Sequence, residues 1–332
     1  MDDACRVMQF AAPRTPLVAA LRPLPCPAEG QVRVRVEACG VCRTDLHVAD
    51  GDLPQAHYPI VPGHEVVGVV DALGANVQAP AVGERVGVPW LGRSCGHCDF
   101  CRAGRENLCD APEFVGCTMD GGFATHMLAH AAWCIRLEGL RAEPASLAPL
   151  LCAGLIGWRA LRAAGPCRQL GLYGFGAAAH ILCPMAVARG VAVHAFTRPN
   201  DVPTQAFARS LGACWAGGSD QAPPRPLDAA ILFAPDGALV PVALGRVRKG
   251  GRVVCAGIHM SDIPSFAYER LWGERDVVSV ANLTREDART YFDAGGDRIE
   301  TCVRTFALQD ANRALQALRD GGLHGAAVIV PG

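Results

Sequence analysis

The chain has 332 residues, of which 50% are hydrophobic and 19% are charged, and its length suggests about two domains. This composition excludes a disordered or a fibrous protein. The formal net charge is −1, so no bulk basic field directs the chain to nucleic acid or to an anionic membrane.

The first six residues are acidic and lack the apolar segment of a signal peptide. The longest apolar stretch, residues 145–158, contains Ser146 and Pro149 and is shorter than a membrane span. We therefore expect a cytoplasmic chain without membrane contacts. In such a chain the sixteen cysteines indicate metal ligation or burial rather than disulfides.

The first 140 residues have the pattern of an irregular β-rich domain. Residues 31–36 read Gln-Val-Arg-Val-Arg-Val, an alternation that predicts a strand with one buried face. Further strand-like segments occur at 66–70 and 84–88, and Gly and Pro residues between them mark turns.

After about residue 166 buried strands alternate with helices, which predicts a doubly wound parallel sheet. The expected strands are 170–173, 191–196, 227–233, 251–257 and 277–280, and the expected helices include 177–189 and 205–211. In the tail, Leu308, Ala311, Leu315 and Leu318 have helical spacing, which Gly321-Gly322 ends. A last apolar strand, 326–330, is expected to return to the first domain.

Four cysteines lie within fifteen residues: Cys95, Cys98, Cys101 and Cys109. Four thiolates suit a tetrahedral Zn²⁺, and such a closed site has no position for substrate. We expect this metal to fold a lobe over residues 93–110. An iron–sulfur cluster also uses four cysteines.

A second group contains Cys42, then His64 and Glu65 about twenty residues later, and Cys152 far downstream. Two thiolates and one imidazole would leave the fourth zinc position open to a substrate oxygen. The spacing alone is a weak indication, because single cysteines and histidines are usually buried or satisfied structural residues.

Residues 39–47, Cys-Gly-Val-Cys-Arg-Thr-Asp-Leu-His, followed by 62–68, Pro-Gly-His-Glu-Val-Val-Gly, closely resemble the zinc-dependent alcohol dehydrogenases of the medium-chain dehydrogenase/reductase superfamily. The four-cysteine segment and residues 148–154, Ala-Pro-Leu-Leu-Cys-Ala-Gly, occur in that family's order. The resemblance extends from about Val32 to the last residues.

The resemblance implies an α/β fold with a GroES-like β-barrel catalytic domain (1–150 and 284–332) and a Rossmann domain (151–283). It also implies that Cys42, His64 and Cys152 bind a catalytic zinc. Thr44 would accept the alcohol proton, and His47 would pass it to solvent. Asp45 would hold the other nitrogen of His64, and Glu65 would lie behind the metal. The alternative for His47 is a surface histidine without a relay role.

Residues 174–179, Gly-Phe-Gly-Ala-Ala-Ala, form a G-x-G-x-x-A fingerprint between a strand and a helix. In such a motif Gly174 makes the tight turn, Gly176 admits the pyrophosphate, and Ala179 lets the helix pack on the strand. The next strand ends in Thr197-Arg198 where an NAD site has an acid. We therefore expect NADP(H) to be preferred over NAD(H). In the alternative, Arg198 is a solvated cation and Asp201 holds the ribose.

Two further residues are assigned by the resemblance. Arg285 matches an arginine that reaches the cofactor pyrophosphate. Trp90 falls where aromatic residues line the family's substrate pocket, although an ordinary barrel-core position fits it equally well.

The sequence thus predicts an NAD(P)-dependent zinc alcohol dehydrogenase or aldehyde reductase with one catalytic and one structural Zn²⁺ per chain. It would transfer a hydride between the nicotinamide and a small-molecule alcohol or aldehyde. The resemblance to the family also implies a homodimer or homotetramer. One alternative is a polyol or secondary-alcohol dehydrogenase, although these often lack the four-cysteine lobe. Another is a non-catalytic cofactor-binding regulatory protein, which has no need of Thr44 and His47. A nucleic-acid-binding zinc module is disfavoured by the net charge.

Overall fold

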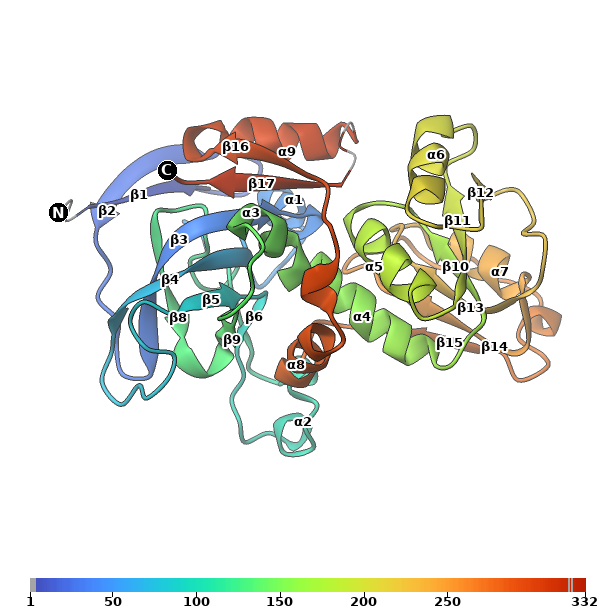
Figure 1. Cartoon of the computed structure of the whole chain (residues 1–332), viewed down its shortest axis with the longest axis horizontal. Coiled ribbons are helices and arrows are strands. Elements are labelled where there is room, and N and C mark those ends of the chain that lie inside the picture. Colours follow the sequence, from blue (N-terminus) through green and yellow to red (C-terminus); the bar gives the residue numbers. More distant parts are fainter. Residues whose placement is uncertain (1–3, 322, 324) are drawn as a thin grey trace. The chain divides into compact units, whose positions relative to one another are not determined.

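The computed structural model describes residues 4–321, 323 and 325–332. The chain separates into two compact units, Met1–Cys152 with Asn282–Gly332 (unit 1) and Ala153–Ala281 (unit 2), shown in Figure 1. The boundaries expected from the sequence, at 150/151 and 283/284, lie two residues from these on each side.

Unit 1 is built mainly of antiparallel strands. Its main sheet has the order β16-β17-β3-β4-β5-β9, with β8 paired to β3, and β1-β2 and β6-β7 form two smaller sheets. The strands are β1 Ala4–Gln9, β2 Val18–Pro23, β3 Gln31–Val41, β4 Glu65–Leu73, β5 Arg85–Val88, β6 Leu91–Arg93, β7 Glu113–Phe114, β8 His126–His130, β9 Ile135–Arg136, β16 Val303–Ala307 and β17 Ala326–Val330. Its α-helices are α1 Arg43–Asp50, α2 Asp99–Arg102, α3 Pro144–Leu147, α8 Arg285–Asp293 and α9 Ala311–Arg319.

The alternating pattern of β3 buries its valines and turns its arginines outward. Val32 and Val34 are fully buried in the core of unit 1, as the period of two predicts. The expected return of the tail is also present, because β17 pairs antiparallel with β3 and parallel with β16. The tail helix is shorter than its apolar spacing suggests: Leu308 lies in a 3₁₀ turn before α9. Gly321 follows α9, whereas Gly322 lies outside the described residues.

Unit 2 is a parallel sheet with helices packed against it (Figure 1). The strand order is β12-β11-β10-β13-β14-β15, and every neighbouring pair is parallel. The strands are β10 Gln169–Tyr173, β11 Ala192–Thr197, β12 Trp215–Gly218, β13 Leu227–Leu232, β14 Val247–Cys255 and β15 Asp276–Ser279. The helices are α4 Ala153–Ala164, α5 Ala177–Val187, α6 Val202–Ser210 and α7 Leu239–Leu244.

Both faces of this sheet are buried, which explains why its central strands are apolar without alternation. Leu170 and Leu172 of β10 belong to one core cluster, and Tyr173 and Leu232 belong to the other.

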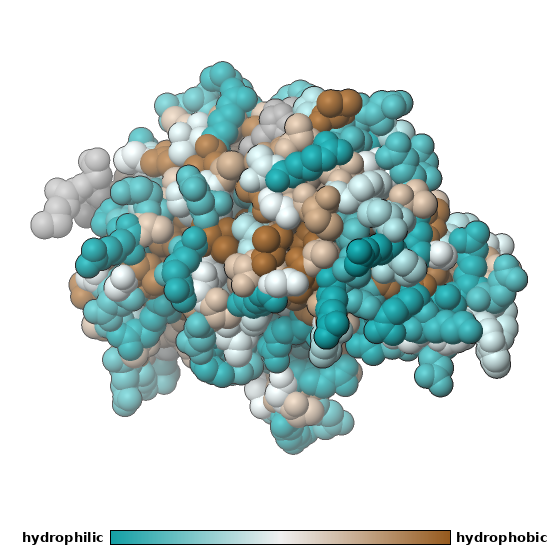
Figure 2. Space-filling model, turned by 45° about the vertical axis from the view of Figure 1, so that its right-hand side comes forward, coloured by the Kyte–Doolittle hydropathy of each residue, from teal (hydrophilic) through white to brown (hydrophobic). Residues whose placement is uncertain are grey.

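Polar residues cover most of the face drawn in Figure 2, with apolar residues between them in small groups. Among the described residues no single helix is long and apolar enough to cross a membrane. One bent pair, Pro144–Leu151 with Ala153–Ala164, passes that test on combined length and composition.

Candidate metal and cofactor sites

Cys42 lies at the junction between β3 and α1, where it is the N-cap residue of the helix. Its Sγ accepts a hydrogen bond from Thr44 N at 3.5 Å, and its own backbone N donates to Asp45 Oδ2 at 2.8 Å. These reciprocal bonds form a capping box that satisfies amides at the start of the helix. The thiol is therefore held in one orientation by the local fold.

His64 directly precedes β4 and is oriented by the same aspartate. Asp45 Oδ1 accepts hydrogen bonds from His64 Nδ1 at 3.2 Å and from Gly63 N at 3.0 Å, and both side chains are buried. Gly63 has a φ of +98°, and a Cβ there would lie 2.4 Å from the ring of Phe123. Within the described part of the chain, the buried Nε2 of His64 has no hydrogen-bond partner. A buried polar atom without a partner points to a missing ligand.

His64 Nε2 lies among further atoms that could bind a metal. The Sγ atoms of Cys42 and Cys152 are 3.9 Å apart, close to the edge of a tetrahedron with metal–sulfur bonds of about 2.3 Å. Donor atoms of Cys42, His64, Glu65 and Cys152 all lie within 4.8 Å of one another. The Cys152 thiol lowers the pKa of Cys42 well below its usual value, against the effect of burial, and His64 adds to the decrease. The donor set therefore fits a Zn²⁺ ion.

Glu65 begins β4 opposite Gly40 of β3. Its side chain is buried, and burial followed by the nearby Cys42 raises the pKa of its carboxyl well above the usual value. A Cβ at position 40 would lie 1.7 Å from Glu65 Oε2. Gly40 is thus required for the carboxylate to fit beside the donor cluster.

Thr44 and His47 follow Cys42 on α1. Thr44 Oγ1 lies 3.6 Å from Cys42 Sγ and is buried. His47 Nδ1 lies 2.8 Å from Asp52 Oδ2, and the His47 side chain is 12% exposed. Gly51 ends the helix with a φ of +78°, which turns Asp52 back toward His47. No motif in the sequence predicted a role for Asp52, although the Gly-Asp pair directly after α1 is a signal that could have identified it.

Trp90 lies in the turn between β5 and β6 and is 4% exposed. Its ring meets the ring of His64 edge to face at 5.1 Å and stacks on Phe114 at 4.9 Å. Its Nε1 donates to Asn282 Oδ1 at 3.2 Å. Trp90 is therefore both a buried residue and a direct neighbour of the donor cluster.

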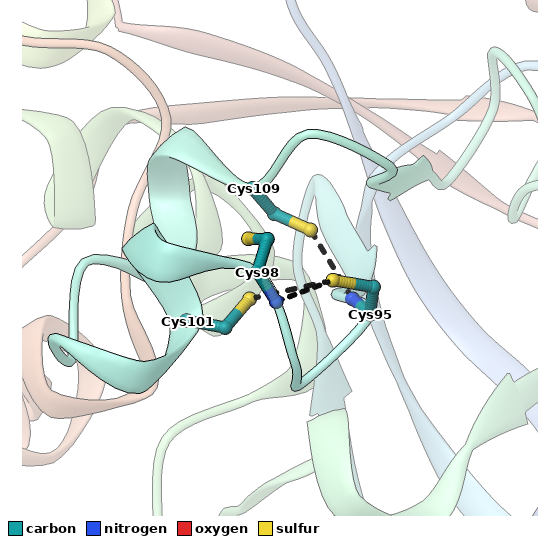
Figure 3. Close-up of side chains that lie close together, drawn as sticks. All are labelled: Cys95, Cys98, Cys101 and Cys109. Atoms are coloured by element: carbon teal, nitrogen blue, oxygen red, sulfur yellow. Dashed lines mark hydrogen bonds between the residues drawn. The ribbon is translucent and has the colours of Figure 1, made fainter.

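The four cysteines of the second cluster converge, as Figure 3 shows. Their Sγ atoms lie within 4.8 Å of one another, with Cys95 and Cys101 at 4.0 Å. Cys95 N donates to Cys109 Sγ at 3.1 Å, and Cys98 N donates to Cys95 Sγ at 3.4 Å. Backbone N–H groups of His97 and Cys98 lower the pKa of the Cys95 thiol to about 6. Such close thiols suit one ion better than an iron–sulfur cluster, which places several iron atoms between its cysteines.

The glycine-rich segment of unit 2 lies between β10 and α5. Gly174 has a φ of +84°, and a Cβ there would lie 2.8 Å from Ala234 N. A Cβ at Gly176, the N-cap of α5, would meet open space. Ala179 is fully buried in the core against the sheet. The start of α5 thus has the features of an anion-binding helix N-terminus.

At the end of β11, Thr197 is buried and Arg198 is exposed. Thr197 Oγ1 donates to Arg198 O at 2.9 Å and accepts from Gln205 Nε2 at 3.1 Å. Asp201 caps α6, and its Oδ1 accepts from Thr204 N at 3.1 Å. The carboxylate considered as a ribose ligand is therefore engaged within its own helix.

Arg285 begins α8 and contacts Glu106 in the four-cysteine lobe. Its backbone N and guanidinium Nη2 donate to the Glu106 carboxylate at 2.7 and 2.9 Å. The guanidinium carbon lies 4.6 Å from the centre of the Trp133 ring. Binding of a cofactor pyrophosphate by Arg285 stays a prediction, and the guanidinium already has an ionic partner.

Unit 1 carries a cluster of metal-binding side chains, and unit 2 combines a parallel sheet with a glycine fingerprint. Together these features define a metal-using dehydrogenase of two domains. Residues 28–139 match the alcohol dehydrogenase GroES-like domain. A probable alcohol dehydrogenase, AdhA, of Mycobacterium tuberculosis is 45% identical over 95% of this chain and 93% of its own. An alcohol dehydrogenase of Geobacillus stearothermophilus is 33% identical over 91% of each chain.

Among solved structures, a cobalt- and zinc-bound thermostable alcohol dehydrogenase of Pyrobaculum aerophilum has a TM-score of 0.88. It is 26% identical, and the match covers 99% of this chain and 100% of the other. The chain belongs to the zinc-type medium-chain alcohol dehydrogenase family. The resemblance noted in the sequence and the expected fold class, a GroES-like domain plus a Rossmann domain, are confirmed.

Proposed function

We propose that the protein is an NAD(P)-dependent zinc alcohol dehydrogenase or aldehyde reductase, with Cys42, His64 and Cys152 as ligands of the catalytic zinc. The observation that carries this proposal is the buried His64 Nε2, without a partner among the described residues, facing two thiols. Asp45 on the other ring nitrogen holds His64 in the tautomer that can bind a metal. The names of the relatives support the same activity.

Zinc bound there supplies a Lewis acid that polarises the substrate oxygen. Thr44, beside the donor atoms, is placed to accept the alcohol proton through its hydroxyl. Asp52 accepts from His47 Nδ1, which leaves Nε2 as the basic nitrogen of that imidazole. His47 and Asp52 extend from the interior toward the surface, because the side chain of Asp52 is 36% exposed. These residues provide a proton path from the site to solvent.

The nicotinamide cofactor supplies or accepts the hydride. In unit 2, Gly174 and Gly176 leave room for the pyrophosphate at the start of α5, and Ala179 packs that helix on the sheet. We propose NADP(H) as the preferred cofactor. The exposed Arg198 suits a 2′-phosphate, and Asp201, the alternative ribose ligand, has its Oδ1 engaged in capping α6.

Cys95, Cys98, Cys101 and Cys109 would bind a second, structural zinc. Their thiols are already held by backbone amides at a spacing suited to one tetrahedral ion. Metal-binding thiols must stay reduced, which fits a cytoplasmic location.

A homodimer or homotetramer is part of the proposal. The edge strand β15 of unit 2 lies beside a groove of about 380 Å³ lined by Ile258, Ile263 and Val277. Ile258 and Ile263 are 48% and 46% exposed, and an open strand edge with apolar neighbours favours pairing with a second copy. Light scattering would give the molar mass, and that of a single chain would contradict this part.

The decisive experiment measures initial rates of aldehyde reduction by zinc-loaded protein with NADPH and with NADH, using one short aliphatic and one aromatic aldehyde. We expect turnover with both substrates and a preference for NADPH. Arg198→Ala should reduce that preference by about tenfold, the effect expected from losing one ionic hydrogen bond. Cofactor binding without turnover would contradict the enzyme assignment, and a preference for NADH would contradict only the cofactor assignment.

A further inference from the structure

Asn282 lies between the donor cluster and the four-cysteine lobe, and both ends of its side-chain amide are bonded. Its Oδ1 accepts from Trp90 Nε1 at 3.2 Å, and its Nδ2 donates to the backbone O of Asn107 at 2.8 Å. We infer that Asn282 is a positioning residue that couples the metal state of the lobe to the wall of the catalytic site. This inference rests on the proposed function for its kinetic part.

On one side the amide fixes Trp90. Trp90 lies in a turn between strands, where its backbone O accepts from Val115 N at 2.9 Å, and three side chains contact its indole. Phe114 stacks on one face of the indole, and His64 meets its ring at an interplanar angle of 78°. The Asn282 bond adds a directional contact at the edge of the indole, on its Nε1. A change at Asn282 therefore moves the aromatic wall next to a metal ligand.

On the other side the amide fixes the lobe. Asn107 lies in the short 3₁₀ helix Glu106–Leu108, and Cys109 directly follows as its C-cap. The same segment is held a second time, because Glu106 accepts from the backbone and the guanidinium of Arg285. Residues 282–285 thus follow the position of the segment that carries the fourth thiol.

The residue type at 282 agrees with this double role. Its φ is +54°, a left-handed conformation that asparagine tolerates better than most residues. Its carboxamide offers an acceptor and a donor on the same planar group. Aspartate would keep the acceptor for Trp90 and lose the donor for Asn107. Glycine would tolerate the backbone and lose both bonds.

These differences define the test. Asn282→Gly, Asn282→Asp and the control Asn76→Gly are compared with the unsubstituted chain. Asn76 has a φ of +62° and donates at the surface to Glu29, so Asn76→Gly reports the backbone effect together with the loss of one surface hydrogen bond. One readout is the KM and kcat for an aromatic and an aliphatic aldehyde. The second is the rate at which a chromogenic chelator removes the lobe zinc, measured in a Cys152→Ser background so that the catalytic site does not contribute.

We expect Asn282→Gly to raise the KM for the aromatic aldehyde and the zinc-release rate by about threefold to tenfold each, the effect of one lost hydrogen bond. The kcat should change by less than about twofold, because the metal ligands and the proton path are untouched. Asn282→Asp should release zinc as fast as the glycine variant but keep the KM of the unsubstituted chain. If either readout of Asn282→Gly equals that of Asn76→Gly, the inference is wrong.

Failure of the proposed function gives a different result. If the zinc-loaded chain shows no turnover, the zinc-release rates still test the lobe side. The fluorescence of Trp90, taken as the difference from Trp90→Phe, then tests the other side. We expect that difference spectrum to shift when the lobe zinc is removed from the unsubstituted chain and not from Asn282→Gly. The absence of a shift in the unsubstituted chain overturns the coupling.

Discussion

At the scale of single residues, the outstanding feature is that one buried carboxylate organises two proposed zinc ligands. Asp45 accepts from His64 Nδ1, from Gly63 N and from the backbone N of Cys42. All three donors point to the same side chain, so its charge fixes the imidazole and the loop before it together. A neutral amide cannot accept all three bonds without placing its NH₂ group against an N–H group.

We therefore expect Asp45→Asn to weaken zinc binding at the Cys42–His64–Cys152 site by about tenfold to a hundredfold. Competition with a chelator of known affinity measures this. Asp50→Asn is the control, because Asp50 lies on the same helix and pairs with Arg319 at the surface. Equal zinc affinity in the two variants would contradict the role given to Asp45.

The sequence identified the donor residues but not everything that holds them. Cys42, His64 and Cys152 were found because a motif preserves their order, although the fold brings Cys152 from 110 residues away. Asp52 and Asn282 were missed because their partners are set by a left-handed turn and by a chain crossover. No periodicity in the sequence encodes such contacts.

At the scale of elements, the pair β3–β4 combines the barrel sheet with the site. Cys42 directly follows β3, and Glu65 begins β4. Gly40 leaves room for the buried Glu65 carboxylate where the two strands pair. Register and chemistry are therefore linked, because a one-residue slip would move Glu65 to the other face.

Gly40→Ala should destabilise the chain by about 1–3 kcal/mol, since the added methyl overlaps the Glu65 carboxylate. Urea denaturation of the zinc-loaded protein measures the change. Glu65→Ala in the same chain removes the carboxylate at 1.7 Å but leaves the Glu65 Cβ at 2.9 Å, so it should recover part of the loss, and the two substitutions should be non-additive. Additive effects would show that Gly40 is needed for another reason.

Element prediction succeeded where the pattern is strong. The expected strand 326–330 coincides with β17, and 227–233 differs from β13 by one residue. The strand β12, Trp215–Gly218, was missed, because two of its four residues are glycine and its burial comes from pairing with β11. Its position at the sheet edge depends on tertiary contacts rather than on local sequence.

At the scale of the whole molecule, unit 2 contains a histidine that should make stability depend on pH. His180 on α5 is 1% exposed, and neither ring nitrogen has a hydrogen-bond partner among the described residues. Burial lowers the pKa of His180 to about 4, below the value of about 6.5 for an unfolded chain. The folded state therefore keeps the imidazole neutral while the unfolded state takes up a proton.

Because the pKa of His180 is lower in the folded state, only the unfolded chain takes up a proton as the pH falls from about 6.5 toward 4. The free energy of unfolding therefore keeps its full value above pH of about 6.5 and decreases over this range. The loss approaches about 3 kcal/mol, from 1.36 kcal/mol per pKa unit. His180→Leu should flatten the fall in unfolding free energy between these pH values, and the exposed His57→Gln should not. Parallel pH profiles for His180→Leu and the unsubstituted chain would contradict the assignment.

The order in which the strands are made differs from their order in space. The proposed ligands of both metals lie before residue 153, so a ribosome releases them all before it has completed unit 2. The strand β17 is made last, yet it takes an interior position between β16 and β3. During synthesis the last residues of β3, Cys39–Val41, therefore lack their β17 partner after the metal-binding segments have been made, although β4 and β8 are already available to pair with β3. Metal binding and closure of this sheet are consequently separate steps during synthesis, and metal binding can come first.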